Sequence, residues 1–141
     1  FLKEDVIQQR GAQPSSLEDL YQLVDIITFH LPLTEQTRSM VNADSFSTMK
    51  PGVVLLHAAR GGVIDESALL VALNSGKVSA AGLDVFETEP PGANELVQHP
   101  NVVATPHIAA QTAEAQVRAA VDVAEEVANV LLKKEIRWRV A

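Results

Sequence analysis

Three side chains in the sequence have the types needed for a proton-coupled oxidation. Arg60, Glu89 and His107 each follow an apolar run of strand length. A histidine with a pKa of about 6.5 can take a proton at neutral pH, and a neighbouring carboxylate fixes its tautomer and stabilises its charged form. A guanidinium binds a carboxylate through two hydrogen bonds, or polarises a carbonyl as negative charge grows on it. Together these groups suit the oxidation of a 2-hydroxy acid, provided that another group accepts the hydride.

Each of these residues also has a plainer explanation when it is taken alone. His107 is then a packed or solvated loop histidine, Arg60 a solvated cation at a strand end, and Glu89 a surface residue of a proline-rich loop. However, Gly61 and Gly62 follow the arginine in "HAARGGVIDE" (57–66) and would let the backbone approach a ligand closely. Three matching groups after successive strands favour one shared site.

The other polar residues near strand ends are expected to be less reactive. Asp84 ends an apolar strand and is expected to belong to the site rather than only to cap a turn. His30 and His57 have apolar neighbours and are expected in the core or behind the site, whereas Asp65 and Glu66 are expected to begin a helix. The four histidines form no i, i+4 pair and the chain has no cysteine, so no metal site is predicted.

Four apolar runs are predicted to form the sheet that positions these residues. They cover residues 24–31, 52–59, 78–86 and 101–105. The first two, "VDIITFHL" and "GVVLLHAA", are expected to be strands buried on both faces. Because predicted helices alternate with these runs, the fold class is α/β with a parallel sheet. The carboxyl ends of parallel strands meet along one edge, where open α/β sheets bind ligands.

Capping residues and glycines mark where the helices begin and end. The predicted helices cover 2–10 before Gly11, the segment after the cap Ser16, 43–49 after the cap Asn42, 65–76, and 113–133 after the cap Thr112. The segment "ETEPPGANELVQHP" (87–100) is expected to be irregular because it is rich in proline and glycine.

The last predicted helix carries one apolar stripe at helical spacing, which we expect to be buried against the sheet. Its members are Val117, Val121, Ala124, Val127, Ala128 and Leu131.

Length and composition limit the class of protein. A chain of 141 residues with 47% hydrophobic residues fits a single globular domain over residues 1–141. A net charge of −7 without a basic patch disfavours partners such as nucleic acid or an anionic membrane. No apolar run reaches the about 20 residues of a membrane span. A cytoplasmic location is expected, since the chain has no cysteine and begins with no signal peptide. Because it lacks an initiator methionine, the chain is expected to be a piece of something longer.

Four stretches of the sequence resemble the D-isomer-specific 2-hydroxyacid dehydrogenases. They are "DIITFHLPLTEQTRSMVN", "MKPGVVLLHAARGGVIDESALLVAL", "AAGLDVFETEPP" and "NVVATPHIAAQTAEAQ". The resemblance places the family's catalytic arginine, glutamate and histidine on Arg60, Glu89 and His107. It implies an oxidoreductase that uses NAD and a small 2-hydroxy or 2-oxo acid. The branch of the family that acts on 3-phosphoglycerate is the most similar.

The resemblance also implies which residues contact NAD. These are Leu31, Pro32, Ala58, Ala59, Arg60, Asp84, His107, Ala109 and Ala110. In the branch named above, position 31 is often threonine and position 57 is often asparagine. Leu31 and His57 depart from that pattern, so the choice of 2-hydroxy acid stays open.

The family's G-x-G-x-x-G phosphate-binding turn occurs nowhere in the sequence. The expected fold is therefore a partial Rossmann-like (doubly wound) parallel sheet flanked by helices, without the first βαβ unit and without the substrate domain. The acid or arginine that distinguishes NAD from NADP would precede Phe1, so that choice is open as well.

The strand at 24–31 would then form an apolar edge of the sheet. Such an edge favours pairing with another chain, so a homo-oligomer or a complex with a complementary chain is expected. The leading hypothesis is a portion of a D-2-hydroxyacid dehydrogenase, with the isolated chain inactive. The alternatives are an NAD-binding interaction module without turnover, and a fold fragment with neither activity nor tight NAD binding.

Overall fold

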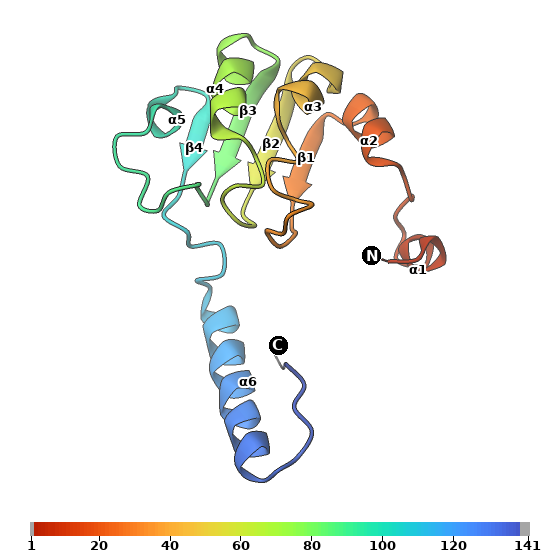
Figure 1. Cartoon of the computed structure of the whole chain (residues 1–141), viewed down its shortest axis with the longest axis vertical. Helices are drawn as coiled ribbons and strands as arrows, with labels where there is room; N and C mark the ends of the chain where they lie inside the picture. Colours follow the sequence, from red (N-terminus) through yellow and green to blue (C-terminus); the bar gives the residue numbers. More distant parts are fainter. Residues whose placement is uncertain (1, 139–141) are drawn as a thin grey trace. The chain divides into compact units, whose positions relative to one another are not determined.

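The computed structural model describes residues 2–138, which form two compact units. The first unit ends at Pro106 and contains the sheet, and the second begins at His107 and contains a long helix (Figure 1). The expectation of a single domain over residues 1–141 stays a proposal. None of the helices in the described residues is long and apolar enough to cross a membrane.

Four parallel strands form the sheet of the first unit, which confirms the predicted fold class. They are β1 (Ile26–Phe29), β2 (Val53–His57), β3 (Val78–Leu83) and β4 (Val102–Ala104), in the order β1-β2-β3-β4. The predicted ranges are too long at one or both ends, because the chain leaves the hydrogen-bonded ladder there to form loops.

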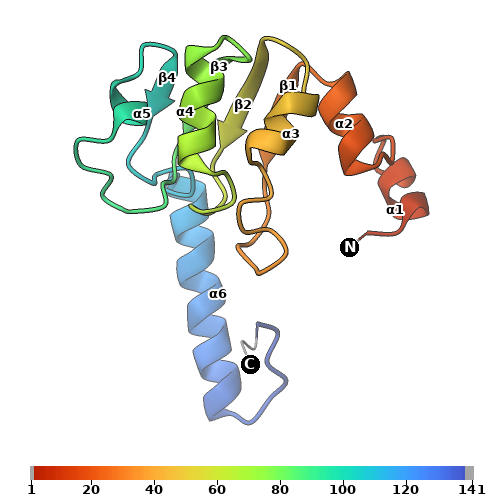
Figure 2. The ribbon, with the colours of Figure 1, turned by 45° about the horizontal axis from the view of Figure 1, so that its top comes forward.

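The helices that connect the strands cover one face of this sheet. Because strand order follows chain order and crossovers between parallel strands are right-handed, each connecting helix lies on the same side. Figure 1 shows α3 and α4 over that side, and the turned view in Figure 2 shows the same layering. The helices of the first unit are α1 (Glu4–Gln9), α2 (Leu17–Leu23), α3 (Ala43–Thr48), α4 (Glu66–Asn74) and α5 (Glu95–Gln98).

The core lies between the sheet and these helices. Ile27, Phe29 and Leu55 point to this side and are buried. On the other face, Ile26 and Leu56 are 60% and 46% exposed. The expectation that the first two strands are buried on both faces is therefore wrong within the first unit, because its connecting helices all lie on one side.

The helix starts follow the capping residues that the sequence indicates. The Ser16 hydroxyl accepts a backbone amide of α2 at 3.0 Å, and the Thr112 hydroxyl accepts one at the start of the last helix at 3.1 Å. Asn42 and Ser45 form a complete capping box at α3. Asp65 caps α4 through a 2.9 Å bond from the Ala68 amide, which confirms its expected role.

The sequence did not predict α5, which lies inside the segment expected to be irregular. The Asn94 side chain accepts the Leu96 amide at 2.8 Å, and Leu96 is 1% exposed. Helix α5 has four residues, too few to show a helical pattern in the sequence. The helix is stabilised by one capping side chain, Asn94, and by one buried apolar side chain, Leu96.

The second unit contains α6 (Ala113–Leu131), close to its predicted range. Within this unit the apolar stripe is uncovered, because no second layer of helices or strands is present among its described residues; the burial of the stripe against the sheet stays a prediction. The exposed members include Val117, Val121, Val127 and Leu131, at 66, 50, 54 and 77%.

Candidate functional site

A small pocket lies at the carboxyl ends of β1 and β2. It has a volume of about 300 Å³. Its lining consists of His30, Leu31, Pro32, Ala58, Ala59 and Arg60. All of these except His30 were predicted to contact NAD, and the structure brings them together at the edge of the sheet where ligands are expected.

His30 is exposed and lines this pocket, so the expectation that it lies in the core or behind the site is wrong. Its Nε2 lies 2.7 Å from the Thr28 hydroxyl. The side chain follows the last residue of β1, where the chain leaves the sheet, so its apolar sequence neighbours do not enclose it.

The loop that carries Arg60 is held by backbone contacts. The Ser39 amide donates to the Gly62 carbonyl at 2.8 Å. A Cβ atom on Gly61 would overlap the carbonyl group of Phe86, and Gly62 has a φ of +85° that side chains rarely allow. Both glycines after the arginine are therefore required by the local geometry.

Arg60 is exposed and lines the pocket. It donates to the carbonyl of Ala59 at 2.7 Å. A guanidinium that lines such a pocket can bind the carboxylate or carbonyl of a ligand.

His57 is the last residue of β2 and is buried, as expected. Its ring meets Phe29 edge-on, with ring centroids 5.6 Å apart. Burial lowers the pKa of the imidazole, while its bond to the Arg60 carbonyl and the charge of Glu66 oppose this shift less strongly. Burial therefore favours the neutral form of the ring.

Asp84 follows β3 directly and is 7% exposed. Its Oδ1 accepts the Thr105 hydroxyl at 2.5 Å, and its amide donates to the His57 carbonyl at 2.9 Å. These bonds join the ends of β2, β3 and β4, so Asp84 occupies the predicted edge of the sheet.

The loop that carries Glu89 is held mainly by carboxylates. Glu89 Oε1 accepts the Phe86 amide at 3.0 Å. Glu66 accepts the Glu87 amide at 2.5 Å and the Asn94 side chain at 2.9 Å, and Glu87 in turn accepts the Glu66 amide at 3.3 Å. Glu66 therefore ties this loop to α4, in addition to its expected place in the first turn of the helix. Sequence spacing carried no signal for this contact, because its partners are far apart along the chain.

The remaining predicted site residues, His107, Ala109 and Ala110, are exposed and belong to the second unit. His107 has a φ of +54°, a backbone conformation that is uncommon outside glycine and that clusters at functional sites. The grouping of His107 with Arg60 and Glu89 stays a prediction.

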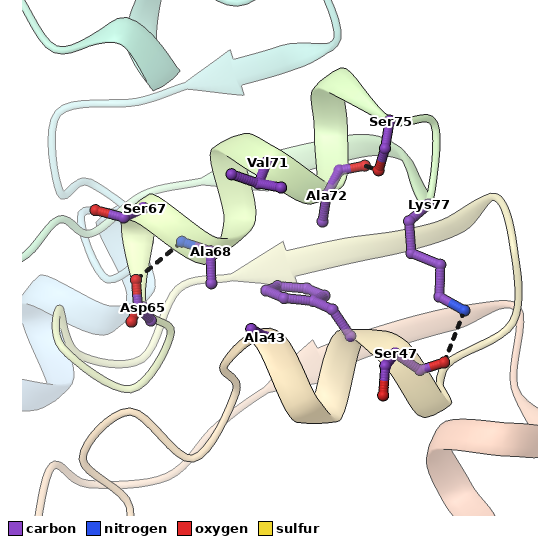
Figure 3. Close-up of a pocket in the computed structure, with 10 residues that line it drawn as sticks. Ala43, Ser47, Asp65, Ser67, Ala68, Val71, Ala72, Ser75 and Lys77 are labelled. Atoms are coloured by element: carbon purple, nitrogen blue, oxygen red, sulfur yellow. Dashed lines mark hydrogen bonds between the residues drawn. The ribbon is translucent and has the colours of Figure 1, made fainter.

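Two larger hollows lie elsewhere and contain none of the predicted site residues. One, of about 510 Å³, lies between α3 and α4 and is shown in Figure 3, where Lys77 donates to the Ser47 carbonyl at 3.1 Å. The other, of about 700 Å³, lies along α6 beside Trp138. We place the candidate site in the smaller pocket because it combines an arginine with the ends of parallel strands.

A parallel sheet with a ligand pocket at the carboxyl ends of its strands is the arrangement of a Rossmann-like nucleotide-binding domain. The chain belongs to the D-isomer specific 2-hydroxyacid dehydrogenases, because the model of that family's NAD binding domain matches residues 2–109. NAD is thus the cofactor of the family, as expected.

Individual relatives agree with this assignment. The chain is 49% identical over 127 residues to D-3-phosphoglycerate dehydrogenase of Bacillus subtilis, which covers 90% of this chain. It is 51% identical over 114 residues to hydroxypyruvate reductase of Thermotoga maritima, which covers 79% of this chain. It spans 24% and 37% of the lengths of these two proteins.

A solved structure shows the same fold. D-lactate dehydrogenase from Aquifex aeolicus, complexed with NAD and lactic acid, matches with a TM-score of 0.84 at 34% identity. The match covers 94% of this chain and 44% of that protein.

Proposed function

We propose that this chain supplies the NAD-binding and catalytic residues of a D-2-hydroxyacid dehydrogenase that oxidises 3-phosphoglycerate. The observation that carries the proposal is the pocket at the ends of β1 and β2, where Arg60 lies beside residues predicted to contact NAD. Since the chain spans about a quarter of its Bacillus subtilis relative, an active enzyme would need further polypeptide to complete the site.

Three side chains have separate tasks in this reaction. His107 accepts the proton of the substrate hydroxyl during oxidation and returns it in the reverse direction. Glu89 orients the His107 ring and stabilises its charged form. Arg60 binds the substrate carboxylate or polarises the oxygen on C2 as its charge changes.

The residues of the pocket fit a nicotinamide cofactor. Ala58 and Ala59 are small, Leu31 and Pro32 offer apolar surface, and the loop at Gly61 has no side chain between its backbone and the end of β3. Further NAD contacts are proposed for Asp84, His107, Ala109 and Ala110. When bound, NAD accepts the hydride that leaves C2 of the substrate.

The identity of the relatives supports a short 2-hydroxy acid, and 3-phosphoglycerate is the proposed one. D-3-Phosphoglycerate dehydrogenases from Bacillus subtilis and Synechocystis are 49% and 42% identical to this chain. Because a hydroxypyruvate reductase is similarly close, D-glycerate is the competing substrate to assay.

The test is NADH formation by the enzyme that contains this segment, with 3-phosphoglycerate, D-glycerate and D-lactate compared. His107→Ala should lower kcat/KM by about 10²–10⁴, the usual effect of losing a general base. His99→Ala is the matched control, since His99 lies before β4 at the opposite edge of the sheet and should leave turnover unchanged. Turnover near the normal rate by His107→Ala would remove the role given to this histidine.

A second candidate, an NAD-binding interaction module, is favoured by the edge at β1. In the described residues β1 pairs with β2 alone, and Ile26 is 60% exposed. An apolar edge of this kind pairs with a strand from a second copy or a complementary chain. Sedimentation of the 141-residue chain should reveal such association or poor solubility, and a stable monomer at high concentration would contradict it.

A further inference from the structure

The side chain of His57 reaches the backbone of the arginine loop. Its Nε2 lies 3.0 Å from the carbonyl oxygen of Arg60. A carbonyl can only accept a hydrogen bond, so Nε2 must carry the proton. His57 is 4% exposed, the most buried of the four histidines, all of which lie within the described residues.

The other ring nitrogen of His57 has no hydrogen-bond partner among the described residues and is out of contact with solvent. A buried acceptor without a partner costs about 1–3 kcal/mol. An aliphatic side chain against Phe29 would avoid this cost, so packing alone does not explain a histidine here. The bond to Arg60 does explain it.

That bond holds the turn between the end of β2 and the arginine. The His57 backbone carbonyl accepts the Asp84 amide at 2.9 Å, which anchors the strand end itself. The ring then reaches over the next two residues to the Arg60 carbonyl. Beyond Arg60, the Ser39 amide holds the Gly62 carbonyl at 2.8 Å. The arginine backbone is therefore fixed from both sides.

We infer that His57 is a positioning residue, which acts through the Arg60 carbonyl to direct the Arg60 side chain into the pocket. The inference rests on the proposed function, because it takes Arg60 as the group that binds the substrate. It makes three separate predictions: one for the tautomer of the ring, one for the stability of the loop and one for turnover.

The tautomer is measured on the 141-residue chain by long-range ¹H–¹⁵N NMR of the imidazoles. At pH 7, His57 should give a ring that carries a proton on Nε2. A neutral ring protonated at Nδ1 alone would overturn the inference, because Nε2 could then not donate to the Arg60 carbonyl. This measurement uses the unmodified protein, so it remains decisive even where a variant fails to fold.

The loop is measured by amide exchange in His57→Leu and His57→Gln. The Ser39 amide reports on the loop, and the Ala81 amide, bonded to the Asn101 carbonyl at 2.9 Å, reports on the pairing of β3 with β4. Leucine removes the donor and should raise the Ser39 exchange rate about fivefold without changing that of Ala81. Glutamine keeps an amide donor near the position of Nε2 and should restore slow exchange. Equal acceleration at both amides in His57→Leu would mean general destabilisation and would refute the inference.

The turnover test uses the enzyme that contains this segment. His57→Leu should lower kcat/KM about tenfold through misplacement of Arg60, and His57→Gln should recover most of it. His99→Leu is the control, because it deletes a comparable hydrogen bond, 3.1 Å from the Asn101 amide, at the other end of the sheet. If Arg60→Ala leaves turnover unchanged, the proposed function fails. If Arg60→Ala abolishes turnover and His57→Leu matches the wild type, the inference about His57 fails by itself.

Discussion

The loops that carry Arg60 and Glu89 leave neighbouring strands of one sheet but are held in different ways. The Arg60 loop is held by close packing and backbone bonds, since Gly61 lies against the Phe86 carbonyl and the Ser39 amide holds Gly62. The Glu89 loop is mostly exposed and is held by the carboxylates of Glu66 and of Glu89 itself.

Because of this difference, the two loops should tolerate different kinds of substitution. A loop held by packing loses its place when volume is added, whereas a change of distant charge leaves it intact. A loop held by carboxylates loses its place when a charge is removed, whereas added volume at an open position changes little. Three experiments test this contrast.

The largest effect is expected from adding one methyl group to each loop. Gly61→Ala should destabilise the 141-residue chain by about 3 kcal/mol, because the new Cβ would overlap the Phe86 carbonyl. In the Glu89 loop, Gly92 has a φ of +59° but no atom within 4 Å of the place that an added Cβ would occupy, so Gly92→Ala should cost only about 1 kcal/mol. Urea denaturation measures both, and equal losses would remove the contrast between the loops.

Removal of one carboxylate should have an intermediate effect. Glu66→Ala deletes the acceptor for the Glu87 amide and the Asn94 side chain, at a cost of about 1–2 kcal/mol. Exchange of the Glu87 amide should then accelerate while that of Ser39 does not. Glu4→Ala is the control, because Glu4 is exposed and lies in helix α1 rather than in either loop. Acceleration at Ser39 equal to that at Glu87 would show that the two loops are not held independently.

The smallest effect is expected on the pH dependence of the free energy of unfolding, through His57 beside the Arg60 loop. Burial lowers the pKa of His57 in the folded chain. The unfolded histidine keeps a pKa of about 6.5. As the pH falls below this value, the unfolded chain binds a proton that the folded chain does not, so the free energy of unfolding decreases. His57→Gln should show a weaker decrease over the same range in urea titrations, since the other titrating groups are shared. Identical pH profiles would mean that His57 keeps its ordinary pKa when folded.

Local signals explain why much of the fold was predicted correctly. Apolar runs of strand length gave β1 to β4, and the caps Ser16, Asn42, Asp65 and Thr112 each bond to the helix that follows them. A cap and its target amide are two or three residues apart, so the pattern is visible in the sequence.

The errors arose where burial depended on what lies across from a side chain. Ile26 is as apolar as a core residue, but no described helix or strand of its own unit covers it. His30 has apolar neighbours along the chain yet lines the pocket, because the chain leaves the sheet at that point. Burial is a property of the packed layers and not of a single segment.

The sequence by itself determined the parallel strands, the helix starts and the family to which the arginine, glutamate and histidine belong, because these depend on patterns between near neighbours or on whole motifs. Only the tertiary structure decided which side chain holds the backbone of Arg60 and which carboxylate holds the loop that carries Glu89. The His57 ring meets the Arg60 carbonyl, and Glu66 meets Glu87, after the chain has turned back on itself. Hydrogen bonds act over about 3 Å, so such partners are chosen by folding and not by distance along the chain.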